Sequence, residues 1–110
     1  MSTNSSLQLR VADTPWQRMR GLLGYPPLQA DQGLLIRPCN MVHTVGMRYP
    51  IDIVYIDATG LILKVVASLP PLRASVCLQA RDVLELKAGV AAAMGLQKGQ
   101  QVPSGLWPAR

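Results

Sequence analysis

The chain has 110 residues, 49% of them hydrophobic, which is enough for one hydrophobic core but too few for two, so we expect a single domain over residues 1–110. No apolar run approaches the roughly 20 residues that cross a bilayer, which excludes a membrane-spanning helix and argues against a membrane partner. The net charge of +5 is carried by bases spread along the chain, and aromatic residues are only 5%, which argues against nucleic-acid binding.

The N-terminal segment combines a polar start with an alternating pattern. Residues 1–6 lack the basic start and the apolar stretch of a secretory signal, so we expect a cytoplasmic protein. Leu7, Leu9 and Val11 then alternate with polar side chains, which is the period of a strand with one covered face. The sequence therefore predicts that the fold begins with a strand.

A helix start signal follows this strand. Thr14 offers a capping hydroxyl, Pro15 suits the first helical position, and Gln17 stands three residues after the cap. We expect the helix to run to Leu22 or Leu23, before a turn rich in glycine and proline, and to keep its arginines outward. Its expected buried face consists of Trp16, Met19 and Leu23.

The remaining elements are predicted from apolar runs separated by turn residues. Residues 34–36 form a short buried strand, and residues 51–56 and 61–67 form a hairpin with a glycine in its turn. Both hairpin strands are apolar on both faces, so both are expected in the middle of a sheet. Residues 68–79 are expected to form a long surface loop or an irregular edge. The last expected elements are a strand at 83–86, a helix at 88–94 and a final short strand at 99–102.

One stretch concentrates the chemically reactive residues. Residues 39–52 hold the only histidine, His43, one of the two cysteines, Cys39, and the acid Asp52. The β-branched residues among them favour extended structure. A period of two then gathers five residues on one side of the strand, which we expect to face the interior. These five residues are Cys39, Met41, His43, Val45 and Met47.

Short motifs also follow one another in a recognisable order. They are Gly21-Leu22-Leu23-Gly24, Gly33-Leu34-Leu35-Ile36, the segment from Pro50 to Asp57, the segment from Val83 to Gly89, and Gly95 followed by Gly99 and Val102. In this order and spacing they resemble the family called domain of unknown function 192 (DUF192). The resemblance covers residues 8–102.

The resemblance implies a compact α+β fold of bacteria and archaea. Its sheet is expected to be curved, mainly antiparallel and barrel-like, with two short helices. It implies no agreed activity. Many members have a Trp-Met pair where this chain has His43 and Thr44, and an acid where it has Gln100. The chain therefore looks like a Cys/His-bearing variant of the family.

A small polar pocket is the first hypothesis for a site. Asp52 stands among apolar residues, and a buried carboxylate needs a partner, which makes it either a structural clasp or the floor of the pocket. Its candidate partners are Arg48, Arg81, His43 and Thr44. Glu85 precedes the helix predicted at 88–94, where an acid favours the positive end of the helix dipole. The expected pocket residues are His43, Thr44, Asp52 and Glu85.

This hypothesis describes a binding module rather than an enzyme. We expect its ligand to be a small molecule or a segment of a partner protein, its state to be monomeric, and its pocket to need no cofactor. A second hypothesis is a structural accessory of a secretion or envelope assembly. Such a protein would expose an apolar patch, for which Leu72 and Trp107 are candidates.

A third hypothesis is a metal- or thiol-dependent hydrolase that uses Cys39, His43 and Cys77. Thiolates and imidazoles are zinc ligands. On a straight strand, however, Cys39 and His43 stand about 13 Å apart, so they could share a metal only if the segment bends. A nucleophilic cysteine would need a neighbouring cation or a helix start to lower its pKa, and the sequence places neither beside Cys39 or Cys77. The two thiols are expected to stay reduced, as small apolar residues of the interior.

Overall fold

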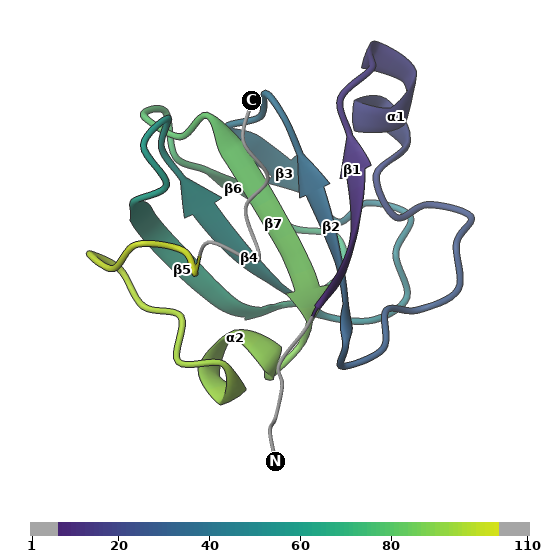
Figure 1. The fold of residues 1–110 in the computed structure, drawn as a ribbon. Coiled ribbons are helices and arrows are strands. Elements are labelled where there is room, and N and C mark those ends of the chain that lie inside the picture. Colours follow the sequence, from purple (N-terminus) through teal and green to yellow (C-terminus); the bar gives the residue numbers. More distant parts are fainter. Residues whose placement is uncertain (1–6, 104–110) are drawn as a thin grey trace.

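The computed structural model describes residues 7–103, and its fold is α+β, with mostly sheet and two short helices (Figure 1). A main sheet has five strands in the order β1-β2-β7-β4-β5, and a second sheet pairs β3 with β6. The strands are β1 (Gln8–Ala12), β2 (Gln32–Ile36), β3 (Met41–His43), β4 (Ile51–Ile56), β5 (Ile62–Leu69), β6 (Ala74–Val76) and β7 (Asp82–Lys87). The helices are α1 (Pro15–Arg20) and α2 (Val90–Ala93). Neither of these helices is long and apolar enough to cross a membrane.

The strand directions in the main sheet are mixed. β1 and β2 run parallel, and the other neighbouring pairs in both sheets are antiparallel. The expected barrel-like closure is wrong. A barrel would need β1 and β5 to pair with each other, whereas these strands form the two edges of the main sheet.

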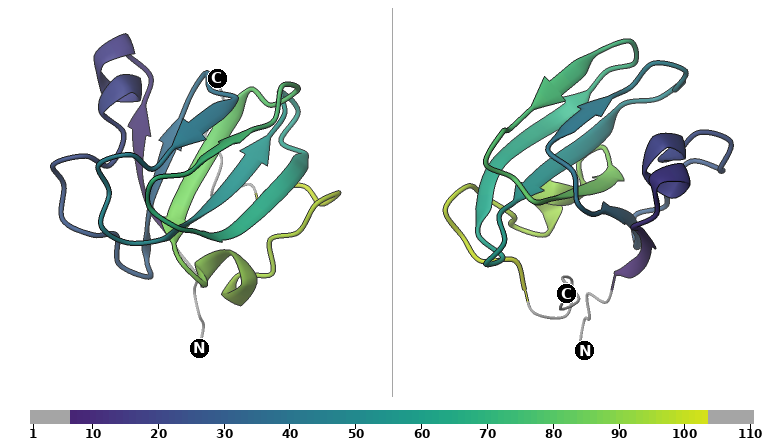
Figure 2. Two further views of the ribbon diagram at one scale, coloured as in Figure 1. Left: turned by 180° about the vertical axis from the view of Figure 1, so that it is seen from behind. Right: turned by 90° about the horizontal axis from the view of Figure 1, so that it is seen from above.

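Different parts of the chain cover the two faces of the main sheet. β4 and β7 at its centre are buried along almost their whole length. Because side chains alternate between faces, Ile53 of β4 packs on one side with Val42 of β3, and Val54 packs on the other with Val90 of α2. The two-stranded β3–β6 sheet and α2 therefore lie on opposite faces, and Figure 2 shows this layering from behind and from above.

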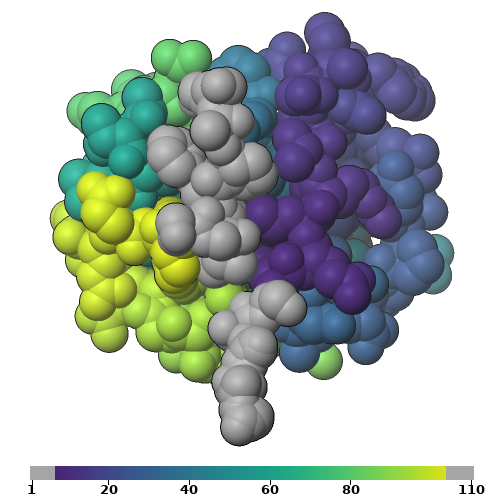
Figure 3. All heavy atoms as spheres, viewed as in Figure 1, coloured from purple at the N-terminus to yellow at the C-terminus, as the bar shows by residue number. Residues whose placement is uncertain are grey.

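The C-terminal part of the described chain packs along the β5 side. In the space-filling view (Figure 3), the yellow segment 95–103 lies on the flank opposite to the purple β1 and α1. The strand expected at 99–102 is reduced to a single bridge between Leu61 and Gln101. Val102 donates its backbone N–H to the Gly60 carbonyl at 2.9 Å. This segment therefore closes the hairpin turn without adding a strand.

One further strand prediction is corrected. β5 lies at the edge of the main sheet rather than inside it, because β4 pairs with β7 on its other side. Most side chains of β5 are half-buried or exposed, with Lys64 in solvent, which is consistent with an edge position. Residues 68–79, expected to form a long surface loop or an irregular edge, contain the short strand β6, which pairs with β3 so that Val42 stands opposite Ser75.

Helix α1 begins where the sequence predicted. The Thr14 hydroxyl oxygen accepts a hydrogen bond from the Gln17 backbone N–H at 3.2 Å, and the Gln17 side-chain oxygen accepts one from the Thr14 N–H at 3.3 Å. Each side chain thus satisfies a free donor at the helix start. The helix ends at Arg20, earlier than expected, because Gly21 adopts a positive φ of 53°.

The expected buried face of α1 is wrong. No residue of the helix is buried, and Trp16 and Met19 are 68% and 71% exposed. The six-residue helix extends beyond the end of β1 instead of lying across the sheet (Figure 1). Its C-terminal end is held to β1 through cation–π contacts with Tyr25. The guanidinium carbons of Arg10 in β1 and Arg20 in α1 lie 3.8 Å and 4.0 Å from the centroid of the Tyr25 ring.

Asp52 joins three elements through one carboxylate. It is 1% exposed, and its Oδ1 accepts a hydrogen bond from the Ser68 N–H at 2.8 Å. Its Oδ2 accepts bonds from the N–H groups of Gly89 at 3.0 Å and Ala91 at 2.9 Å. Gly89, the N-cap of α2, has no side chain of its own for this purpose. The β4 carboxylate therefore caps α2 and fixes it against the end of β5.

We expect Asp52→Ala to destabilise the protein strongly. The substitution leaves three backbone N–H groups without their acceptor, at a cost of about 3 kcal/mol or more in the free energy of unfolding. Urea titration followed by circular dichroism measures this change. Asp31→Ala, at an exposed acid, is the control and should change stability by less than about 0.5 kcal/mol. Equal effects of the two substitutions would contradict the role assigned to Asp52.

Candidate functional site

A recess of about 70 Å³ opens between α1 and β3. Leu22, Ile36 and Glu85 form its buried floor. Arg18 and Met19 line its α1 side, and the β3 side is lined by Cys39, Met41, His43 and Val45. Residues 74–76 of β6 do not line it, so the recess lies on the side of β3 that faces away from β6. We call it the α1–β3 recess.

The Glu85 carboxyl is the main polar group of the floor. Its residue is 4% exposed, and within residues 7–103 its side chain has no hydrogen-bond or ion-pair partner. Burial raises the pKa of Glu85 from the usual 4.5 to about 7. The group therefore changes protonation near neutral pH, and a ligand in the recess could satisfy it.

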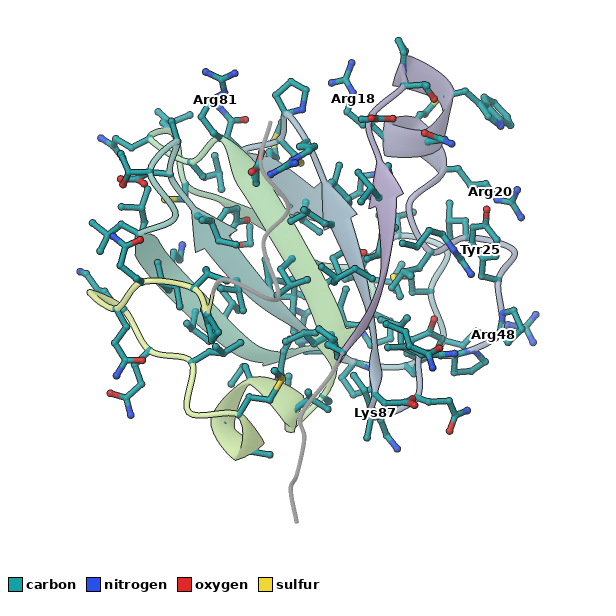
Figure 4. The ribbon with its side chains drawn as sticks, in the orientation of Figure 1. Arg18, Arg20, Tyr25, Arg48, Arg81 and Lys87 are labelled. Atoms are coloured by element: carbon teal, nitrogen blue, oxygen red, sulfur yellow. The ribbon has the colours of Figure 1, made fainter. Side chains whose placement is uncertain are left out.

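Arg18 brings a second unsatisfied group to the wall of the recess. Its Nη1 donates to the Pro38 carbonyl at 3.4 Å, whereas its buried Nε has no hydrogen-bond partner in the described part of the chain. Figure 4 shows Arg18 and Arg20 projecting from the α1 side of the molecule. The recess thus combines an unsatisfied N–H donor with an unsatisfied carboxyl.

Exposed apolar side chains surround this polar centre. Met19 is 71% exposed, Met41 62%, Val45 56% and Leu23 36%, and all four line the recess. They come from α1, from the segment that follows it, and from β3 and its C-terminal extension. A group of exposed apolar side chains around one recess is typical of an interaction surface.

His43 lies on the β3 side of the recess, exposed to solvent. Its Nδ1 accepts a hydrogen bond from the Val45 N–H at 3.3 Å. The prediction that the face with His43 and Cys39 turns inward is therefore wrong for the imidazole. The intervening residues Val42 and Thr44 are the buried ones: Val42 packs against the main-sheet core, and the Thr44 hydroxyl bonds to the loop between β5 and β6.

The four predicted pocket residues are not gathered in one pocket. His43 and Glu85 both line the α1–β3 recess. Asp52 lies on the other face of the main sheet, because it stands opposite Leu86 in the register that places Ile53 opposite Glu85. None of its candidate side-chain partners binds it within residues 7–103, where its acceptor sites are filled by backbone N–H groups.

Thr44 has a structural position. Its hydroxyl donates to the Pro70 carbonyl at 2.7 Å and accepts from the Arg73 N–H at 2.9 Å. It is fully buried and does not line the recess. Thr44 therefore fixes the loop between β5 and β6 against the end of β3.

Both cysteines are free and half-buried. The Cys39 S–H donates to the Met41 carbonyl at 3.1 Å, and burial is the main cause that raises the pKa of this thiol. A raised pKa disfavours the thiolate that a nucleophile needs. Among the residues that the structure describes, no group of three or more His, Cys, Asp or Glu side chains could hold a metal ion. Burial thus disfavours Cys39 as a nucleophile, and the hydrolase hypothesis stays a prediction.

Sequence reasoning missed Arg18, Met19, Met41 and Val45 as parts of the site. It assigned the arginine to solvent and the three apolar residues to core packing. No signal in the sequence separated these exposed apolar residues from core residues, because a period shows which residues share a face but not whether anything covers that face. Of the apolar patch expected for an accessory protein, Leu72 is 69% exposed, and Trp107 lies outside the described residues.

Comparison with known proteins identifies one family. The DUF192 family model, described as "Uncharacterized ACR", matches residues 1–104. No curated protein matches the chain.

Two solved bacterial structures are similar in fold. A protein of unknown function from Novosphingobium aromaticivorans gives a TM-score of 0.79 at 20% identity, over 88% of this chain and 74% of that one. A protein from Sinorhizobium meliloti, provisionally described as a transcription regulator, gives a TM-score of 0.78 at 24% identity, over 86% of this chain and 79% of that one. At these identities the likeness concerns the fold alone.

We expect Glu85→Gln to stabilise the protein increasingly as the pH rises. Between pH 4.5 and about 7, the folded state keeps a proton on Glu85 that the unfolded state has released, so wild-type stability falls with pH. Above this range the loss of unfolding free energy caused by the buried Glu85 carboxyl is complete and amounts to about 3 kcal/mol. The difference in unfolding free energy between the variant and the wild type should grow by this amount, as measured by urea titrations across the range.

Asp57→Asn is the matched control for this measurement. The Asp57 carboxylate accepts a hydrogen bond from the Thr59 hydroxyl at 2.7 Å, which is the main cause that lowers its pKa from the usual 3.8. The stability that Asp57 contributes is therefore lost only in more acidic solution, as the pH falls through its lowered pKa. A pH-independent difference for Glu85→Gln would contradict a buried carboxyl without a partner.

We also expect Cys39 to react slowly. In a Cys77→Ser variant, iodoacetamide should modify the remaining thiol at least about tenfold more slowly in the folded protein than in urea, because burial limits access and raises the thiol pKa. Mass spectrometry over time measures both rates. A faster reaction in the folded protein would contradict this expectation and support the thiol hypothesis.

Proposed function

The chain belongs to the DUF192 family, whose model matches residues 1–104, and we propose that it is a binding module that holds a segment of a partner protein in the α1–β3 recess. This proposal keeps His43 and Glu85 from the predicted pocket. In place of Thr44 and Asp52 it includes Arg18 and the apolar residues around the recess, which are Met19, Leu23, Met41 and Val45. The observation that carries it is an apolar rim, exposed to solvent, around a buried and unsatisfied carboxyl.

The size of the recess favours a protein segment over a small molecule. Sites for drug-sized ligands and cofactors have volumes of about 300–1,000 Å³. The recess itself, of about 70 Å³, accommodates a single short side chain. A wider, more open hollow of about 380 Å³ shares Arg18, Met19, Cys39 and Met41 with it and has room for neighbouring residues of an extended segment. The rest of the binding surface is then the apolar rim, which can contact the neighbouring residues of the same segment.

The composition of the rim supports this type of partner. Met19 and Met41 stand on opposite sides of the recess, with Leu23 and Val45 beside them. Methionine side chains are flexible and polarisable, so they adapt to different apolar partners. A rim of this kind contributes affinity while the recess selects one residue of the partner.

The free edge of β3 supports an extended conformation of the partner. Within residues 7–103, β3 pairs only with β6, and the recess lies on its other side. An unpaired strand edge offers backbone N–H and C=O groups to an added strand. A partner segment that pairs with Met41 and His43 would therefore run along the recess and could direct one side chain into it.

We expect selection from a random decapeptide library displayed on phage to give peptides that bind the α1–β3 recess. Met41→Asp places a charge on the apolar rim of the recess, which is the centre of the proposed interface. It should lower the affinity for these peptides by about 30-fold, as measured by fluorescence anisotropy titrations. Folding of the variant is verified by circular dichroism.

Leu78→Asp is the matched control, because Leu78 is also an exposed apolar residue, at 75%, but does not line the recess. This variant should bind the selected peptides like the wild type. Failure to enrich any peptide, or equal binding by Met41→Asp, would overturn the proposed function.

A further inference from the structure

Two buried polar groups in the α1–β3 recess lack partners, and together they indicate which side chain the recess accepts. Within residues 7–103, neither the Glu85 carboxyl nor the Arg18 Nε–H forms a hydrogen bond. Buried polar groups in native proteins are almost always paired, so the buried Arg18 Nε–H, together with a carboxyl without a partner in the same recess, points to a missing ligand group. This inference rests on the proposed function and specifies its partner.

We propose that the recess binds the carboxamide of an asparagine or glutamine side chain in the partner segment. A carboxamide carries an acceptor oxygen and a donor NH₂ group on one carbon atom. Its oxygen accepts the Arg18 Nε–H, and its NH₂ group donates to Glu85. Both groups of the recess are then satisfied by one neutral side chain.

The volume of the recess fits this group. An apolar cavity of about 150 Å³ accommodates a benzene molecule with its six carbon atoms. By the same measure, about 70 Å³ suits a group of roughly three heavy atoms. The carbon, oxygen and nitrogen of a carboxamide make such a group, whereas the single oxygen of a hydroxyl leaves much of the space empty.

The charges around the recess disfavour charged side chains. A lysine or arginine that pairs with Glu85 would also meet Arg18 in the wall, with Arg20 beside it. An aspartate or glutamate that pairs with Arg18 would also meet Glu85. A leucine would leave both polar groups buried without partners, which costs more than leaving them to water. A neutral side chain that both donates and accepts avoids all three penalties.

Synthetic peptides test this proposal. In the peptides selected as above, we expect an asparagine or glutamine at the position whose replacement most weakens binding. Changing this residue to aspartate, leucine or lysine should lower the affinity for the wild-type protein at least about tenfold, because each change leaves a buried group unpaired or repelled. These measurements require no protein variant, so they hold whatever the substitutions do to folding.

A variant at the floor of the recess then tests whether Glu85 is the group that recognises the carboxamide. In Glu85→Met, the preference for asparagine over leucine should fall at least about tenfold relative to the wild type, in a double-mutant cycle. Leu78→Asp should keep the wild-type preference. Unchanged preference in Glu85→Met would overturn the assignment to Glu85.

The two proposals fail in different ways. Peptides that lose binding with Met41→Asp but carry an apolar, charged or hydroxyl residue at the selected position would overturn the carboxamide inference and leave the binding function in place. Peptides that are insensitive to Met41→Asp would overturn the binding function itself.

Discussion

The antiparallel register of β4 with β7 decides how two buried carboxyl groups are used. Asp52 stands opposite Leu86 and Ile53 opposite Glu85, so side-chain alternation directs the two acids to opposite faces of the main sheet. Asp52 meets three backbone N–H groups from β5 and the start of α2. Glu85 faces the α1–β3 recess and finds no bonding partner in residues 7–103. One strand pairing thus creates a structural carboxylate on one face and an unsatisfied carboxyl on the other.

The recess exists because short elements form its walls. α1 has six residues and β3 three, so neither can bury all of its apolar side chains against the main sheet. Tyr25, between the guanidinium groups of Arg10 and Arg20, holds the end of α1 near β1 without closing the gap to β3. Apolar side chains that would belong to a core in a longer helix or strand therefore remain at the surface, where a partner can cover them.

Local signals in the sequence predicted most of the fold. The Thr14 cap and the hairpin of β4 and β5 were predicted correctly because both depend on residues close together in the chain. The position of β5 in the sheet was not, since it depends on β7 pairing with β4 from the other side. The burial of Trp16 and Met19 was wrong because a helical period indicates an apolar face but not whether anything covers it.

The candidate site could be predicted only in part. The sequence by itself determined the family motifs, the α+β composition, and that Asp52 lies in an apolar strand where its carboxyl would be buried. It assigned Glu85 to the start of the following helix, whereas Asp52 caps α2 and Glu85 faces the recess. The side of residues 39–47 that carries His43 was expected to face inward, and this was wrong because the apolar pattern does not distinguish the two sides: Val42 and Met41 are equally apolar. Only the tertiary structure placed His43 outside and gave Asp52 its donors, up to 39 positions away in the chain. The physical reason is that burial follows from contacts between distant segments, whereas the pattern along a strand fixes only which residues share a side.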